Sequence, residues 1–578
     1  MDPSEEFTLT WLDYLLLTLT LGSSVFIGIY HSLSKNKPKT LDEYLFGNKN
    51  MPMLPILFSN IASAVSCTAI VILPRETYYY GNQMMFVPLA EIASLFCNYF
   101  FFLPVILKLG YTSIFEYLEK RFNKFTRRFG SILYSATQIL FSLISIFAAG
   151  QAVAEVLPIS FFIFAPAACL LCTAYTALGG LRGVVWVDAF QATIMFISVA
   201  IFIITGMFDV GGVNKVIDIY KKGGRTDVDY LDFSPFVRNS PVTTWLSSFF
   251  ITLISTVINQ GIVQRYMSLP SYNKAKIISI YTGIGNALLY FLPVILGIVV
   301  YATYYDCDPG MSKLLKNTNQ LTIYYVIDKG RNIPGLVGLL SASVLSAAFS
   351  TMSTIMNSVS AVIYEDFIKP LIPWELTVSQ SNLIIKSLVV IIGIINALGI
   401  FALNDVGSIY QLFKTTISFT NGVIIFIFIF GMFSRRANSK GAIAGGFAGV
   451  IVSLWLGLGI QSAVSSGKIK YYSKIVSTEG CPPNITENLN LNVTTTGFLG
   501  YVPVTFDEDL PYIYRLSFNL ITLISLLTSI IIGLIISTIT SNNEEVDDSL
   551  LVPQLRKKKK KVLESFEEEE MERLKAVS

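Results

Sequence analysis

Charged residues are scarce in this sequence. Only 14% of the 578 residues are Asp, Glu, Lys or Arg, whereas a soluble protein carries about 25%. There is one histidine, His31, and the six cysteines form no Cys-x-x-Cys pair and no metal-ligand spacing. We find no nucleophile–base pair and no phosphate-binding loop, so an enzyme is not expected. The net charge of +3 is too small to indicate a nucleic-acid partner.

Long apolar runs take the place of the missing charge, and 53% of the residues are hydrophobic. Runs of about 20 apolar residues are typical of transmembrane helices, and their continuity differs from the alternating pattern of a membrane β-barrel. The sequence therefore predicts an all-α polytopic protein embedded in a lipid bilayer, with about 13 spans. These are 9–33, 52–74, 84–108, 129–155, 157–178, 184–207, 243–263, 277–304, 334–364, 381–403, 407–433, 440–463 and 513–540.

Lys and Arg gather in the loops after the first, third, seventh and eleventh spans. Because basic loops stay on the cytoplasmic side of a membrane, we expect residues 1–8 outside the plasma membrane and the tail 541–578 inside. The basic residues are Lys35, Lys37, Lys39, Lys49, Lys120, Arg121, Lys124, Arg127, Arg128, Arg265, Lys274, Lys276, Arg435, Arg436 and Lys440.

The long loop 464–512 falls outside in this topology. It holds both glycosylation sequons, at Asn484 (N-I-T) and Asn492 (N-V-T), which are modified only on that side. Cys307 and Cys481 also lie in outside loops, where the compartment permits a disulfide between them. The sequons and the basic loops thus indicate the same orientation.

Hydroxyl side chains line one face of the ninth predicted span. Between Ser341 and Ser360 they recur at steps of three and four residues, which places them on one stripe of a helix. Such a stripe either lets a neighbouring helix pack closely or supplies oxygen ligands to a small cation. The stripe alone favours packing, and the rest of the chain shifts the balance toward the cation.

Two charged residues stand inside predicted spans, where charge is costly. Asp188 lies near the start of the sixth span. It is either a first-turn acid favoured by the helix dipole or the negative charge of a cation site. Lys414 lies about 12 Å along the eleventh span. It either snorkels to the outer interface or faces a cavity and holds an anionic substrate.

The second and seventh spans are unusually polar for membrane helices. The second contains S-N-I-A-S-A-V-S-C-T, and the seventh ends in I-N-Q-G-I-V-Q-R-Y. Such residues favour an unwound turn, and transporters bind sodium with carbonyls freed in this way. Two interrupted helices in corresponding halves of a chain indicate a transport site.

Phrases spread over most of the chain resemble the sodium/solute symporters, a family that includes the sodium–glucose, sodium–iodide, monocarboxylate and multivitamin carriers. The phrases are P-R-E-T-Y-Y-Y-G (74–81), T-S-I-F-E-Y-L-E-K-R-F-N (112–123), T-A-L-G-G-L-R-G-V-V-W-V-D-A-F-Q (176–191), N-Q-G-I-V-Q-R-Y (259–266), Y-Y-D-C-D-P (304–309) and F-S-T-M-S-T-I-M-N-S (349–358). Those at 112–123 and 304–309 look most like the monocarboxylate, multivitamin and iodide branch.

The resemblance implies a LeuT-type fold of two inverted five-helix repeats, 52–207 and 243–433, with 9–33 before them and 440–540 after. It also implies a sodium site between the broken first helix and the eighth helix of the core. Its ligands would be the carbonyls of Ala62, Val65 and Ala347 and the hydroxyls of Ser350 and Thr351. A second sodium site of some relatives matches Asp188, Ser350, Ser353 and Thr354.

This chain departs from its relatives near the expected substrate cavity. Asn421-Gly422 stands where the monocarboxylate branch has Gly-Gly, and Lys414 replaces an apolar residue. The substrate residues of the sugar carriers are missing, which argues against glucose. The candidate cavity residues are Ser66, Cys67, Thr68, Asn259, Gln260, Gln411 and Lys414.

The sequence thus predicts a sodium-coupled symporter that imports a small organic solute by alternating access. A monocarboxylate or a carboxylate-bearing vitamin is the expected solute. The alternatives are a symporter of a neutral solute or of an inorganic anion such as iodide, and a solute sensor or sodium leak channel on the same scaffold.

Overall fold

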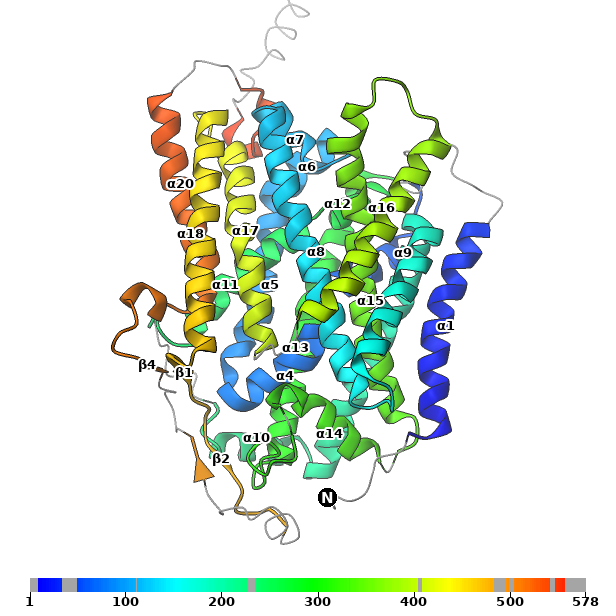
Figure 1. Cartoon of the computed structure of the whole chain (residues 1–578), viewed down its shortest axis with the longest axis vertical. Helices are drawn as coiled ribbons and strands as arrows, with labels where there is room; N and C mark the ends of the chain where they lie inside the picture. Colours follow the sequence, from blue (N-terminus) through cyan, green and yellow to red (C-terminus); the bar gives the residue numbers. More distant parts are fainter. Residues whose placement is uncertain are drawn as a thin grey trace, which may run out of the picture.

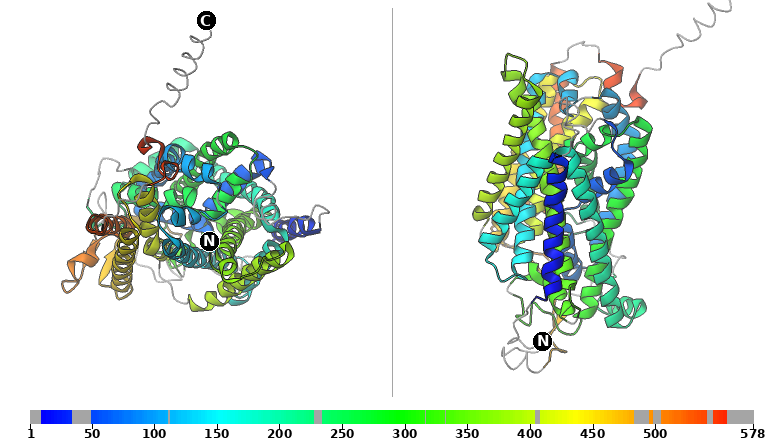
Figure 2. Two further views of the ribbon diagram at one scale, coloured as in Figure 1. Left: turned by 90° about the horizontal axis from the view of Figure 1, so that it is seen from above. Right: turned by 90° about the vertical axis from the view of Figure 1, so that its right-hand side faces the viewer.

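The computed structural model describes residues 9–33, 49–110, 112–226, 234–315, 317–331, 333–403, 408–482, 495–497, 504–540 and 546–556. Most of them are helical, and the long helices run side by side along the long axis of the molecule (Figure 1). Seen from above, they form a rounded bundle with α1 (Trp11–Leu33) at its edge (Figure 2). The predicted N-terminal segment 1–8 and the sequons Asn484 and Asn492 lie outside the described residues.

The first predicted repeat begins with a bent pair of helices and ends with one very long helix. Its elements are α3 (Met53–Ala64), α4 (Cys67–Tyr80), α5 (Phe86–Cys97), α6 (Leu103–Leu109), α7 (Glu116–Arg121), α8 (Lys124–Ala154) and α9 (Phe161–Val210), followed by α10 (Val213–Lys222).

The second predicted repeat also begins with a bent pair. Its elements are α11 (Pro241–Val257), α12 (Gln260–Met267), α13 (Tyr272–Thr303), α14 (Leu321–Gly330), α15 (Leu336–Ile363), α16 (Val378–Gly399) and α17 (Ile409–Phe433), and α18 (Ser439–Ser465) and α20 (Ile521–Ile539) follow.

Ten described helices are long and apolar enough to cross a membrane, or twelve if each bent pair is one span. The difference from the thirteen predicted spans lies in α9. Its 50 residues would extend about 75 Å if straight, more than twice a hydrocarbon core of about 30 Å. Gly180 breaks it, with a non-helical φ of 56° and ψ of −163°. The two parts of α9 correspond to the fifth and sixth predicted spans.

Helix α15 lies at the centre of the bundle and carries the hydroxyl stripe. In its most apolar window 94% of the residues are buried, and it packs against α9, α8 and α1. Because α15 is covered on all sides, its hydroxyls face protein groups rather than lipid. The central helix of the fold therefore carries a stripe of buried hydroxyls.

One end of the bundle carries the short strands, together with α10 and α14 (Figure 1); we refer to it as the strand end. Strand β1 (Ile469–Tyr471) pairs antiparallel with β4 (Val504–Phe506), and β2 (Val476–Ser477) with β3 (Thr495–Thr496). A disulfide joins Cys307, which follows α13, to Cys481. Nearby, the Asp308 N–H donates to the Ser477 carbonyl at 2.8 Å. These links hold the loop after α18 onto the bundle.

The opposite end of the bundle, where α7 lies, is covered by part of the C-terminal tail. Leu550, Leu551 and Val552 are buried there. The Val552 N–H donates to the Met432 carbonyl at 3.1 Å. Burial of these three apolar side chains explains why residues 546–556 pack against the bundle. We refer to this end as the α7 end.

Candidate ion and solute sites

The α3–α4 break frees backbone carbonyls in the middle of the bundle. The helices meet at a bend of 52°. The last helical bond of α3 runs from the Val65 N–H to the Ile61 carbonyl at 3.3 Å, and the Ala69 N–H donates to Ser66 at 2.9 Å to begin α4. Val65 and Ser66 between them are extended. Because carbonyls at a helix end lack their usual donors, Ala62 and Val65 present oxygens suited to a cation.

The predicted sodium ligands lie where α3 meets α15. Ala62, Val65, Ala347, Ser350 and Thr351 are all 0% exposed, and α3 packs against α15. The Thr351 hydroxyl is buried, and no hydrogen-bond partner for it occurs among the described residues. A buried hydroxyl without a partner is costly. Neutral oxygens of this kind fit a weakly held monovalent cation.

The predicted second site is a buried ion pair in the structure. Asp188 Oδ2 accepts hydrogen bonds from Ser59 and from Arg265, each at 2.8 Å. Arg265 also donates to the Thr354 hydroxyl at 2.5 Å. Asp188 and Arg265 are 0% and 1% exposed. A guanidinium thus lies among the oxygens that the sequence assigned to sodium.

Of the other two candidate ligands of the second site, Ser350 lies close to this pair. Ser350 Oγ is 3.4 Å from the hydroxyl of Ser63, which itself contacts Asp188 at 3.3 Å. Ser353 instead donates to the Ser350 carbonyl of its own helix at 3.2 Å.

The position of Arg265 corrects the sequence prediction, which counted it among the basic residues of a cytoplasmic loop. It lies on α12, which continues the bundle after the bend at Asn259, where α11 and α12 meet at 44°. Its burial is sustained by Asp188, because a buried charge requires a charged or hydrogen-bonding partner. Pairing with Asp188 was not visible in the sequence, since the two residues are 77 positions apart.

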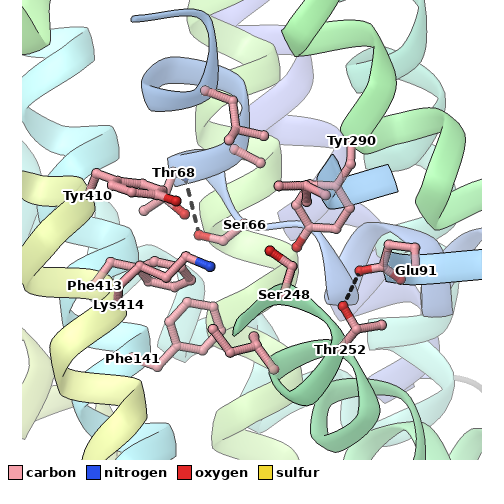
Figure 3. Close-up of a pocket in the computed structure, with 14 residues that line it drawn as sticks. Ser66, Thr68, Glu91, Phe141, Ser248, Thr252, Tyr290, Tyr410, Phe413 and Lys414 are labelled. Carbon is pink, nitrogen blue, oxygen red and sulfur yellow. Dashed lines mark hydrogen bonds between the residues drawn. The ribbon is translucent and has the colours of Figure 1, made fainter. Parts of the chain in front are cut away.

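A cavity of about 50 Å³ lies beside the break, with room for only a few water-sized groups (Figure 3). Lys414 of α17 reaches it from one side, and Ser66 of the break and Thr68 of α4 line it. The Lys414 ammonium has one hydrogen-bond partner, the Ser247 hydroxyl at 3.4 Å. No carboxylate among the described residues forms an ion pair with it. Lys414 therefore faces the cavity as a buried amine without a counter-ion among the described residues.

The four other predicted cavity residues do not line this cavity. Cys67 donates to the Ser145 carbonyl at 2.9 Å, and Gln411 donates to Gln461 at 3.1 Å. Asn259 caps α12 by accepting from the Gly261 N–H at 2.8 Å. Gln260 donates to the Thr112 carbonyl at 2.7 Å. They hold helix ends and connections in place.

Glu91 of α5, which is not among the predicted residues, lines the cavity opposite Lys414 (Figure 3). An acid within the apolar run P-L-A-E-I-A was the signal that could have found it. The prediction also lacks the aromatic residues that form the cavity walls, Phe141, Tyr290, Tyr410 and Phe413.

Arg238 lies next to the cavity, beside Tyr410. Its guanidinium donates to the buried carboxylate of Glu76 at 3.0 Å. Burial lowers the pKa of Arg238, but the Glu76 charge outweighs this effect and raises it above the usual value. The guanidinium therefore stays charged.

Four aromatic rings surround this guanidinium. Tyr410, whose ring lies 5.9 Å from it, also lines the cavity. We call Glu76, Arg238 and these rings the outer plug. The other three rings are those of Tyr80, Tyr471 and Phe518, at 4.8, 5.0 and 5.4 Å.

Comparison with known proteins identifies the family. Residues 44–449 match the model of the sodium:solute symporter family. The chain is 30% identical over 540 residues to the rabbit (Oryctolagus cuniculus) sodium-dependent multivitamin transporter, covering 92% of this chain and 83% of that protein. It is 32% identical over 560 residues to the mouse (Mus musculus) sodium-coupled monocarboxylate transporter 1, covering 93% and 89%.

A solved structure shares the fold. It is a Na⁺-coupled sialic acid symporter in a substrate-bound outward-open state, with a TM-score of 0.75 at 20% identity, covering 93% of this chain and all of that one. This agreement supports the predicted LeuT-type architecture. On the match of both the family model and full-length relatives, the chain belongs to the sodium:solute symporter family.

Proposed function

We propose that this protein imports a small carboxylate-bearing solute together with sodium across the plasma membrane. The observation that carries the proposal is Lys414, a buried ammonium in the cavity beside the broken helix, without a carboxylate partner among the described residues. Burying an unpaired charge is expensive, and a solute carboxylate would offset that cost. The named substrates of the related monocarboxylate and multivitamin transporters are of this class.

Sodium would be held by the carbonyls of Ala62, Val65 and Ala347 and the hydroxyls of Ser350 and Thr351. These groups come from α3 and α15, so the ion would fasten the broken helix to the central helix. Inward movement of one sodium through about 100 mV releases about 2.3 kcal/mol. That energy supports roughly 50-fold accumulation of solute before the sodium gradient itself is added.

A second sodium would require Asp188 to exchange Arg265 for the ion. The contacts of Asp188 with Ser59 and Ser63 support this idea, because these hydroxyls would remain as neutral ligands around the carboxylate. Release of Arg265 would free the α12 end of the bundle to move. Binding at this site and opening toward the α7 end would then be coupled.

Alternating access needs a barrier on each side of the cavity. The outer plug provides one barrier, at the strand end. We take this end as extracellular because the sequons of loop 464–512 are expected on that side. The Asp188–Arg265 pair lies on the other side of the α3–α4 break, toward the α7 end, which we take as cytoplasmic. Opening one barrier at a time would move the solute without forming a continuous pore.

Radiotracer uptake into proteoliposomes tests the proposal. The panel comprises lactate, nicotinate, biotin, pantothenate, iodide and glucose, each measured with a sodium gradient and with potassium in its place. We expect sodium-dependent accumulation of at least one carboxylate, and none of glucose. Selective accumulation of iodide would contradict the carboxylate assignment. Sodium current that is independent of any solute gradient would instead indicate a leak channel.

A further inference from the structure

The solute cavity contains a second buried charge besides Lys414. Glu91 is 3% exposed, and its Oε1 accepts a hydrogen bond from the Thr252 hydroxyl at 2.7 Å. Its other oxygen, Oε2, is buried and has no partner among the described residues. No described Lys or Arg forms an ion pair with it. Glu91 of α5 thus lines the cavity with a carboxyl group that has one open oxygen, and it also lines a smaller adjoining cavity with Asn98, Tyr266 and Thr282.

Glu91 and Lys414 do not neutralise each other. They approach the cavity from opposite sides, Glu91 on α5 and Lys414 on α17. Ser248 and Tyr290 lie between the two side chains, and Thr252 lies beside Glu91 (Figure 3). Charged side chains buried in a protein are normally paired, as Asp188 and Arg265 are here. A basic and an acidic side chain without ionic partners in one small cavity fit a ligand with two charges of opposite sign.

A third polar group fits the same ligand. Ser248 of α11 is 3% exposed, and its hydroxyl has no hydrogen-bond partner among the described residues. Ser248 and Glu91 both line the cavity, and each has an oxygen that can accept a hydrogen bond. An ammonium group carries three N–H donors and would satisfy both oxygens, whereas a quaternary ammonium would satisfy neither by hydrogen bonding.

We propose that Glu91 is a specificity-determining residue of the solute site, and that the preferred solute is a small zwitterion. Its carboxylate would bind Lys414 and its primary or secondary ammonium would bind Glu91 and Ser248. A plain monocarboxylate would satisfy Lys414 but leave the Glu91 oxygen without a partner. This inference rests on the proposed function, because it assigns the second half of the same solute.

Matched pairs of short solutes test the inference in proteoliposomes of the full chain. Propionate is compared with 3-aminopropionate, and butyrate with 4-aminobutyrate, as sodium-dependent substrates and as competitors of one another. We expect each amino form to bind at least tenfold more tightly than its plain partner. Equal or weaker binding of both amino forms overturns the inference.

The variant Glu91→Gln separates recognition from structure. It keeps the shape and the hydrogen bond to Thr252 but removes the charge. We expect it to weaken binding of the amino forms at least tenfold and to change binding of propionate and butyrate less than threefold. An equal loss for both solute types would show a structural role and overturn the inference. Asp209→Asn, which removes a half-exposed carboxylate on α9, serves as the matched control.

Failure of this inference and failure of the proposed function give different results. If sodium drives uptake of propionate and butyrate without any preference for the amino forms, only the zwitterion assignment fails. If Lys414→Met leaves uptake of every carboxylate unchanged, the proposed carboxylate site itself fails.

Discussion

Among the buried pairs of acidic and basic side chains in this bundle, two differ in whether the partners touch. Asp188 and Arg265 touch each other at 2.8 Å, and each also bonds a hydroxyl, that of Ser59 for Asp188 and that of Thr354 for Arg265. Lys414 and Glu91 border the same cavity and form no ion pair. The first pair satisfies its own charges, as a structural or gating contact does. The second leaves its charges open, as a binding site for a charged ligand does.

This comparison teaches which charges the fold itself requires. Removing one partner of a buried ion pair leaves the other charge bare. Removing a charge that has no partner takes away a cost instead. Loss of Arg265 should therefore damage the protein, whereas loss of Lys414 should damage only transport.

The largest effect is expected from Arg265→Met. The buried Asp188 carboxylate would be left without its cationic partner. Breaking such a buried pair lowers the free energy of unfolding by about 3–5 kcal/mol. Thermal unfolding of the purified protein in detergent measures the loss. The double variant Arg265→Met, Asp188→Asn removes both charges and should recover most of the stability. A double variant as unstable as the single one would show that the pair is not the source of the effect.

Lys414→Met gives the opposite pattern. A charge-assisted hydrogen bond to the solute contributes about 1.5–3 kcal/mol, so the apparent affinity for carboxylates should fall at least tenfold. The unfolding temperature should not fall, because the variant removes an unpaired buried charge. Uptake kinetics and thermal unfolding are measured on the same preparation. A marked drop in unfolding temperature would contradict the contrast between the two pairs.

Thr351→Ala tests the proposed neutral sodium ligand at the junction of α3 and α15. One ligand of five is lost, so the sodium concentration for half-maximal uptake should rise about tenfold, equivalent to about 1.4 kcal/mol. Ser343→Ala is the matched control, because its hydroxyl is also buried on α15 without a described partner. Similar sodium activation in the two variants would reject the ligand assignment of Thr351.

Much of this architecture was predictable from the sequence, because membrane helices leave continuous apolar runs. The break after Ala64 was visible in the polar composition of S-N-I-A-S-A-V-S-C-T. The two parts of α9 were also predicted, as two separate spans, because T-A-L-G-G-L separates two apolar runs at Gly180.

The partners of the charged residues were not predictable. Arg265 follows a polar patch and therefore resembles a loop residue, and only the fold brings it to Asp188. Glu91 and Lys414 are 323 positions apart, so their common cavity depends on how α5 and α17 pack. The outer plug has the same origin, because Glu76, Arg238 and the rings around it come from distant segments.

The smallest effect is expected at the surface of the α7 end. Arg435 and Asp548 form an ion pair at 2.6 Å there, with side chains 32% and 38% exposed. Exposed pairs contribute about 0–1 kcal/mol, so Asp548→Asn should shift the unfolding temperature far less than Arg265→Met does. The buried Leu551 nearby would keep the tail in place without the ion pair. If Asp548→Asn lowered the unfolding temperature as much as Arg265→Met, burial would not explain why the Asp188–Arg265 pair matters more than the Arg435–Asp548 pair. The large effect expected for Arg265→Met would then need another physical cause.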